Sequence, residues 1–286
     1  MKTYPHLFSK LFCQPLMLNE PVRHSLEAAL LSHMGIAAPQ AAVMPQESKT
    51  QRVARILETY GNVAVVHMDG VIDKHISQFE MDCYGGYDIA DFDRALQAVA
   101  ADPKIQRVVL NINSPGGSVI GVAEAAARVA ELTATKEVHA FVDAMACSAA
   151  YYIARQADHI AAAPSAIVGC IGVYLSLLDA HRNTEMQGYK VTLVTAGKYK
   201  AMGSPYKTLS DEERAMMQAG VTDLHAQFKA AVRSGRRGAT ERGGHATVPD
   251  SAMEGQWMDA KDGLAARLVD ELTNANLDEY VAALLT

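Results

Sequence analysis

The sequence predicts an α/β domain with a largely parallel sheet, flanking helices and a mostly helical C-terminal region. Short apolar runs alternate with helical patterns over residues 62–196, whereas strand-like runs almost stop after Pro205. Parallel strands need crossover connections, and helices usually supply them. Of the 286 residues, 49% are apolar and 20% are charged, which is typical of a globular protein with a substantial core.

Five short runs predict the strands, because each is apolar or β-branched and is bounded by polar or turn-forming residues. They cover residues 63–67, 107–112, 137–142, 159–163 and 190–195. Four helical patterns lie between them, at residues 88–101, 119–132, 147–156 and 175–187. The first pattern is the clearest, since Phe92, Leu96 and Val99 recur at three- and four-residue spacing.

Three regions divide the chain. Residues 1–60 predict an N-terminal extension and linker, with helices at 21–33 and 51–60 around an Ala-, Pro- and Gln-rich stretch at 37–50. Residues 61–205 predict the α/β core. Residues 206–286 predict a helical region that completes the domain, with helices at 211–232, 258–266 and 277–285 and a Gly- and Arg-rich loop at 233–245.

The composition argues against several classes of protein. A net charge of −6 is the opposite of the basic excess of nucleic-acid-binding proteins, so no nucleic-acid partner is expected. The four cysteines form neither a CxxC pair nor a cluster with histidine, so we expect no metal, no cofactor and a reducing compartment. No signal peptide and no run of roughly 18 apolar residues is present, so we expect a soluble, unsecreted, cytoplasmic protein without a membrane partner.

The first candidate site segment is Asn113–Gly117, which follows a buried strand and precedes a helix. Ligands of parallel α/β sheets bind at this end of the strands. Gly116 and Gly117 let the backbone approach a substrate and can aim N–H groups at a developing oxyanion, or equally at a phosphate. A strand-to-helix turn that needs glycine at positive φ explains the same residues.

The second segment, residues 144–153, places Ser148 where a strand ends and a helix begins. A hydroxyl there faces the positive end of the helix dipole, which helps to stabilise an oxyanion. Serine is also a favoured N-cap, and on local grounds capping is its ordinary role. The neighbouring Cys147 is a rival nucleophile, although small buried cysteines usually belong to the core.

The third segment, residues 196–205, follows a strand and offers Lys198 and Lys200. Most lysines are solvated surface charges. A lysine acts as a general base only when it is neutral, so its pKa must fall from about 10.4 towards about 7–8. Lowering the pKa that far costs about 4 kcal/mol, which burial in an apolar pocket can supply.

Taken in this order, the segments resemble the signal peptide peptidase A family of serine peptidases, which share the Clp-protease/crotonase fold. The matching motifs are Asn113–Gly117, Cys147–Ile153, Gly169–Val173 and Gly197–Pro205, and Gly263–Asp270 is similar to the closing segment of the family. The resemblance covers about residues 62–270. Four motifs in order are more specific than any one of them.

The resemblance implies a role for each matched residue. The nucleophile falls on Ser148 and the lysine base on Lys200, with Lys198 as the alternative register, and the two form a Ser-Lys dyad. The oxyanion and substrate-binding positions fall on Ser114, Gly116, Gly117 and Ala149, and the supporting positions on Cys170 and Tyr199. The chain departs from the family where Ala149 and Ala150 replace glycines. It departs again where Cys170 replaces the serine that orients the lysine, since cysteine is a weaker donor and acceptor.

The implied reaction is acyl transfer. Neutral Lys200 takes the proton of Ser148 Oγ, the serine oxygen attacks a peptide carbonyl, and the N–H groups of Gly116 and Gly117 hold the oxyanion. We expect the peptide to lie extended near Asn113–Gly117, where main-chain hydrogen bonds hold it as an added strand.

Three segments are similar to the phage branch of this family, the head-maturation peptidases: Tyr4–Phe12, Pro15–Leu18 and His181–Gly188. This branch implies scaffold or portal proteins as substrates, and a location in the host cytoplasm or inside a procapsid. The family also implies a ring-like homo-oligomer. In such a ring the serine and the lysine of one site can come from neighbouring subunits, with the helices from residue 210 onward partly at the interface.

Several alternatives stay open. A Clp-type Ser-His-Asp triad would recruit His159 or His181, whereas an acyl-CoA crotonase would leave Ser148 and Lys200 without a role. A cytoplasmic peptidase of the signal-peptide-peptidase type would share the fold, and so would a capsid-assembly protein that has lost activity. The arginines of loop 233–245 would suit a nucleic-acid contact or a self-cleavage site, but a solvated loop explains them better.

Overall fold

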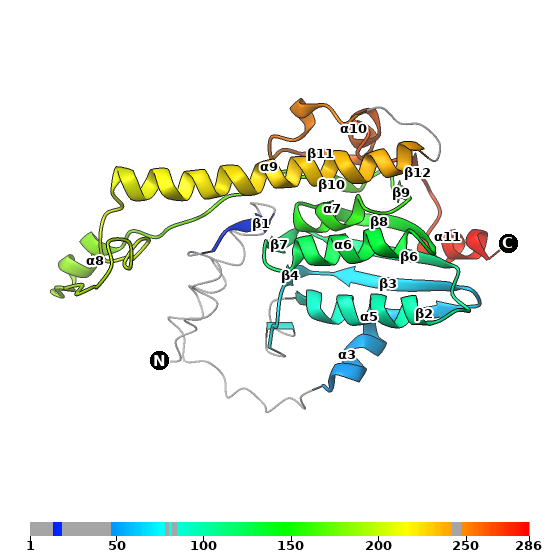
Figure 1. The fold of residues 1–286 in the computed structure, drawn as a ribbon, viewed down its shortest axis with the longest axis horizontal. Coiled ribbons are helices and arrows are strands. Elements are labelled where there is room, and N and C mark those ends of the chain that lie inside the picture. Colours follow the sequence, from blue (N-terminus) through cyan, green and yellow to red (C-terminus); the bar gives the residue numbers. More distant parts are fainter. Residues whose placement is uncertain (1–13, 19–46, 78–79, 82–84, 242–246, 286) are drawn as a thin grey trace.

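The computed structural model describes residues 14–18, 47–77, 80–81, 85–241 and 247–285 (Figure 1). The strands of its larger sheet are β2 (Leu57–Tyr60), β3 (Val63–Asp69), β6 (Arg107–Ser114), β8 (Glu137–Cys147), β9 (His159–Ala162), β10 (Ile167–Gly169), β11 (Trp257–Asp259) and β12 (Glu271–Leu272). Their order is β11-β10-β8-β6-β3-β2, with β9 beside β8 and β12 beside β9. All the inner pairs are parallel, and β2 and β11 are antiparallel edges. The predicted α/β class with a largely parallel sheet is confirmed.

A smaller sheet has the order β1-β7-β4-β5. Its strands are β1 (Leu16–Leu18), β7 (Gly116–Ser118), β4 (Val71–Asp73) and β5 (Gly86–Asp88). Gly117 pairs with Met17 on one side and with Ile72 on the other. A Cβ atom on Gly117 would lie 1.8 Å from the carbonyl oxygen of Ile72, so only glycine lets these backbones approach each other.

Three helices cover one face of the larger sheet: α5 (Ile89–Ala101), α6 (Val122–Leu132) and α7 (Ala149–Ala154) (Figure 1). Their buried side chains, such as Phe92, Val129 and Ile153, share one apolar core with alternate residues of the strands. α5 begins where the Asp88 carboxylate accepts the N–H of Ala90, as expected of an N-cap.

The opposite face of the sheet carries a second, smaller core. Val65, Val109 and Phe141 alternate along their strands with the residues that face α5 and α6, so they point to the other side. There they pack against Tyr280 and Val281 of α11 (Leu277–Leu284). The C-terminal helix is therefore an integral part of the domain.

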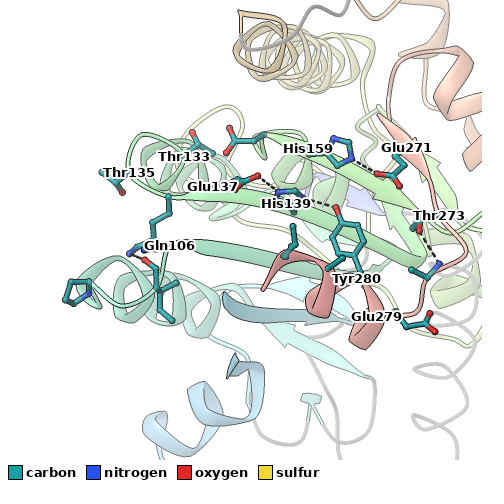
Figure 2. A pocket seen from close by; sticks show the side chains of 17 residues that line it. Gln106, Thr133, Thr135, Glu137, His139, His159, Glu271, Thr273, Glu279 and Tyr280 are labelled. Carbon is teal, nitrogen blue, oxygen red and sulfur yellow. Dashed lines mark hydrogen bonds and ion pairs between the residues drawn. The ribbon is translucent and has the colours of Figure 1, made fainter. Parts of the chain in front are cut away.

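A polar cavity of about 1100 Å³ borders this second core (Figure 2). Within it, Tyr280 Oη lies 2.8 Å from His139 Nδ1, and His139 Nε2 lies 2.9 Å from a Glu137 oxygen. The hydrogen bond from His139 lowers the pKa of Glu137, and burial raises the pKa of Tyr280. The His139 Nε2–H group therefore donates to an ionised Glu137, and the Tyr280 hydroxyl donates to Nδ1.

The Tyr280 hydrogen bond supports a stability prediction. Tyr280→Phe is expected to lower the free energy of unfolding by about 1 to 3 kcal/mol, because the buried His139 Nδ1 loses its donor. Urea unfolding measures the change. Tyr60→Phe is the matched control, since its hydroxyl bonds to Glu58 at the exposed surface and its loss is expected to change little. Equal effects of the two variants would contradict the role of Tyr280.

The longest helix, α9 (Asp211–Glu241), extends past the sheets, and α8 (His181–Met186) lies at its projecting end (Figure 1). We call residues 175–210 the arm. The chain returns from α9 through a short 3₁₀ helix, η1 (Asp250–Ala252), to β11 and α10 (Ala260–Ala265). No helix in the described part of the chain is both long and apolar enough to cross a membrane.

The N-terminal elements differ from the prediction in places. The helix expected at 21–33 lies outside the described residues, as does most of the 37–50 stretch. The helix expected at 51–60 is α3 (Lys49–Ile56), which the Ser48 capping box starts and which ends where β2 begins. Because β1 and β2 pair with strands of the two sheets, parts of the predicted extension belong to the folded core.

The arm and the C-terminal region also differ. The helix expected at 175–187 shortens to α8, and residues 190–195 form no strand because the arm stands apart from both sheets. α9 continues through the first part of the loop expected at 233–245. A Cβ on Gly235 would lie 2.1 Å from the Arg155 guanidinium, so the helix and this buried arginine pack in close contact. The helix expected at 258–266 begins as β11.

Candidate active site

Ser148 stands between β8 and α7, where the chain leaves the larger sheet. Its backbone has φ 55° and ψ −116°, a sparsely populated conformation for a residue with a side chain. Its side chain makes no capping hydrogen bond to α7. Only 1% of the residue is exposed. The ordinary N-cap role is therefore not the role that this serine plays.

Ser148 lines a cavity of about 430 Å³ at the carboxyl ends of β8 and β10. Its N–H group donates to the Gly169 carbonyl of β10 at 2.8 Å, which fixes the backbone of Ser148 against that strand. The other residues that line the cavity come from four separate stretches of the chain: Leu18, Cys170, Gly172, Val173, Tyr174, His225, Glu254, Gly255 and Trp257. Tertiary packing alone brings these stretches together.

Gly116 packs directly against Ser148. Its φ is +97°, and a Cβ atom there would lie 2.9 Å from the Cβ of Ser148. Ser114 Oγ accepts the N–H of Gly116 at 3.2 Å and donates to the Gly70 carbonyl at 2.6 Å, so it braces this turn. Ala149 carries the first N–H of α7, a group that has no acceptor within a helix. Gly116 and Ala149 therefore adjoin the serine, and Ser114 holds Gly116 in place.

Cys170 follows β10 as Ser148 follows β8. Gly169 and Cys147 are paired in the parallel register, and the two residues that follow them line the same cavity. Cys170 also has a positive φ, 54°, and its N–H donates to the Gln256 carbonyl at 2.9 Å. Cys147, the rival nucleophile, is fully buried in the core and does not line the cavity.

The predicted lysines lie in the arm, and neither lines the Ser148 cavity. Lys198 Nζ and Tyr199 Oη both donate to Glu212 of α9, at 2.6 and 2.5 Å. The hydrogen bond from Lys198 to Glu212 raises the pKa of Lys198, so this lysine is held in its charged form. Lys200 is exposed and makes no ion pair with any residue that the structure describes. A single chain therefore does not join a lysine to the serine.

Comparison with known proteins assigns the chain to a family. The model of peptidase family S49 matches residues 130–284, which is more than half of the chain and includes Ser148, Cys170 and Lys200. The chain belongs to peptidase family S49. The family resemblance expected from the four motifs is thereby confirmed.

Two relatives of this S49 chain match over nearly its whole length. The capsid assembly protease C of Escherichia phage lambda is 27% identical over 96% of this chain, and the head-tail preconnector protein GP5 of Enterobacteria phage P21 is 28% identical over 95%. The chain spans 64% and 55% of the length of these two proteins. An enoyl-CoA hydratase structure from Shewanella pealeana has 13% identity and a TM-score of 0.43, with 83% of this chain and 75% of that chain covered.

His225 lines the cavity of this S49 chain, although no sequence motif marks it. Its Nε2 lies 3.0 Å from the Ile171 carbonyl and 2.8 Å from the Met253 carbonyl, so the Nε2–H group donates to the backbone. Only the packing of α9 brings it here. The candidates for a triad lie elsewhere. His159 hydrogen-bonds to Glu271 beside the second core, and His181 hydrogen-bonds to Asp179 in the arm.

Proposed function

We propose that this S49 chain is a serine endopeptidase in which Ser148 is the nucleophile and Lys200 is the general base. The conformation of Ser148 carries the proposal: the serine is buried and strained, its side chain makes no capping hydrogen bond, and it lines a cavity beside Gly116. Backbone strain persists where the surrounding structure enforces it, and strained residues cluster at active sites.

Peptide cleavage proceeds by acyl transfer. Lys200 Nζ removes the proton from Ser148 Oγ, and the serine oxygen attacks the peptide carbonyl carbon. Because the N–H of Gly116 already donates to Ser114, the N–H of Ala149 is the best placed of the predicted oxyanion donors. The lysine then protonates the leaving amine, and water hydrolyses the acyl-enzyme.

In this proposal Lys200 reaches the Ser148 of a neighbouring subunit. A lysine serves as a base only where burial favours its neutral form, and Lys200 of a single chain is exposed. The arm also exposes large apolar side chains: Met186, Tyr189 and Val194 are 88%, 67% and 93% exposed. Exposed apolar surface of this kind suits contact with a second copy of the chain, which would bury the lysine against the Ser148 cavity.

The proposed substrates are proteins of the phage head, such as a scaffold or portal protein. This choice rests on the names of the two relatives that match nearly the whole chain, a capsid assembly protease and a head-tail preconnector protein. A peptidase of the signal-peptide-peptidase type, which degrades peptides more generally, is the alternative. Incubation with purified scaffold protein and with unrelated unfolded proteins separates them, since a maturation peptidase cuts the scaffold at a few defined sites.

Covalent labelling tests the nucleophile. A fluorophosphonate probe is expected to label the wild-type protein on the peptide that contains Ser148, because an activated serine attacks phosphorus as it attacks a carbonyl. Ser148→Ala is expected to remain unlabelled, and Cys170→Ala to keep a label on Ser148. Mass spectrometry after proteolysis locates the adduct. A folded, oligomeric protein that stays unlabelled in every form tested would identify a capsid-assembly protein that lacks peptidase activity.

A further inference from the structure

The N-terminal strand β1 lies where a peptide substrate is expected. Leu16, Met17 and Leu18 pair in antiparallel register with Ser118, Gly117 and Gly116, the stretch beside which the extended substrate is predicted. All three β1 side chains are buried, although the next strand among the described residues begins only at Leu57. We call the space between Gly116–Ser118 and Tyr174 the groove, and a segment of this same chain occupies it.

Hydrogen bonds hold β1 on both of its edges. On the edge away from β7, the Leu16 N–H donates to the Tyr174 carbonyl at 2.9 Å, and the Tyr174 N–H donates to the Leu16 carbonyl at 3.1 Å. On the other edge, Gly116 has so little room that a Cβ atom would lie 2.2 Å from the Met17 carbonyl oxygen. A strand inserted between two backbones in this way is the β-augmentation mode of peptide binding.

The direction of β1 matches that of the acyl side of a substrate. The strand runs from Leu16, opposite Tyr174, to Leu18, opposite Gly116, and Gly116 packs directly on Ser148. Leu18 also lines the cavity that Ser148 lines. Because alternate side chains of a strand point the same way, Leu16 and Leu18 face one side of the groove, with Leu18 nearer to the serine.

We infer that β1 is a built-in pseudosubstrate, and that the chain inhibits its own site by filling the acyl-side groove with Leu16–Leu18. The inference rests on the proposed function of Ser148. A substrate must displace β1 before it can pair with Gly116–Ser118, so the measured affinity for substrate equals the intrinsic affinity multiplied by the fraction of molecules in which the groove is open. Because β1 is tethered to the domain, it competes at a high local concentration.

Two variants of the full chain weaken β1 in different ways. Leu18→Ala removes the apolar side chain beside Ser148, and Leu16→Pro removes the N–H that bonds to Tyr174. Hydrolysis of an extended fluorogenic peptide is expected to rise in kcat/KM by about tenfold or more for Leu18→Ala. Leu132→Ala is the matched control. It truncates an equally buried leucine, which lies at the end of α6 and does not line the Ser148 cavity.

A free peptide with the sequence Gln-Pro-Leu-Met-Leu, residues 14–18, provides a second measurement that does not depend on Leu16→Pro folding. It is expected to inhibit Leu18→Ala competitively, whereas a scrambled peptide is not. Unchanged kcat/KM in both variants, together with normal fluorophosphonate labelling of Ser148, would overturn the pseudosubstrate and leave the proposed function intact. Absence of labelling in every form of the folded protein would overturn both.

Discussion

Lys200→Met is expected to lower kcat for peptide hydrolysis by about 10²- to 10⁴-fold, the range that a positioned general base contributes. Methionine keeps the length and the apolar character of the side chain, so the loss reports the amine. Lys198→Met is the matched control: this lysine lies in the same arm, is paired with Glu212 of α9 and lies outside the proposed dyad. Steady-state kinetics on an oligomeric sample, checked by light scattering, measures both variants.

The same variant decides whether the dyad forms between subunits. Lys200→Met and Ser148→Ala are each expected to be inactive, but a co-assembled mixture regains activity if one subunit supplies the serine and its neighbour the lysine. With random assembly of equal amounts, about a quarter of the sites carry both groups. A mixture as inactive as its components would place both groups in one chain. Full activity of Lys200→Met with loss in His225→Ala would move the base to the cavity histidine.

Gly117→Ala is expected to lower the free energy of unfolding by about 3 kcal/mol or more, because the added methyl group would press into the backbone of β4. Its nearest neighbours would be the carbonyl oxygen, the carbonyl carbon and the nitrogen of Ile72, at 1.8, 2.6 and 2.7 Å. No side-chain rotation relieves contacts with backbone atoms, so the smaller sheet has to shift.

Gly220→Ala is the control for that substitution. Gly220 lies inside α9, and apart from its chain neighbours and the nearby backbone of the helix nothing lies within 4 Å of the position that a Cβ would take. Alanine there is expected to stabilise the helix by about 0.5 to 1 kcal/mol. Urea denaturation of the two variants should therefore give changes of opposite sign. A Gly117→Ala protein as stable as the wild type would show that β7 and β4 do not approach as closely as described.

The periodicity of the sequence determined the core elements. β3, β6, α5 and α6 lie within a few residues of their predicted positions, because burial on the sheet demands apolar runs and helical spacing that are visible locally. The predicted strand at 190–195 failed because its β-branched pattern describes a segment suited to pairing, and the arm offers no neighbouring strand. Periodicity indicates that a segment is suited to form a strand, but it does not show whether a neighbouring strand is available for pairing.

The site divides in the same way. Motif order pointed to Ser114, Gly116, Ser148 and Cys170. The adjacent parallel strands β6, β8 and β10 bring the segments that carry these residues together. His225, in the middle of α9, lies in no motif, and the resemblance of Pro15–Leu18 to the phage branch gave Leu18 no role at the site. Both reach the cavity through contacts between segments far apart in the chain.

The sequence by itself determined the α/β class, the family resemblance and the serine to examine, because apolar spacing and short motifs are local properties. Only the tertiary structure decided that Ser148 is strained and does not cap its helix, that Lys198 is tied to Glu212 while Lys200 is exposed, and that β1 occupies the groove. Those facts depend on which backbones meet across long stretches of chain. Local sequence does not predict these long-range contacts, because the free energy of packing that fixes them is shared by the whole core.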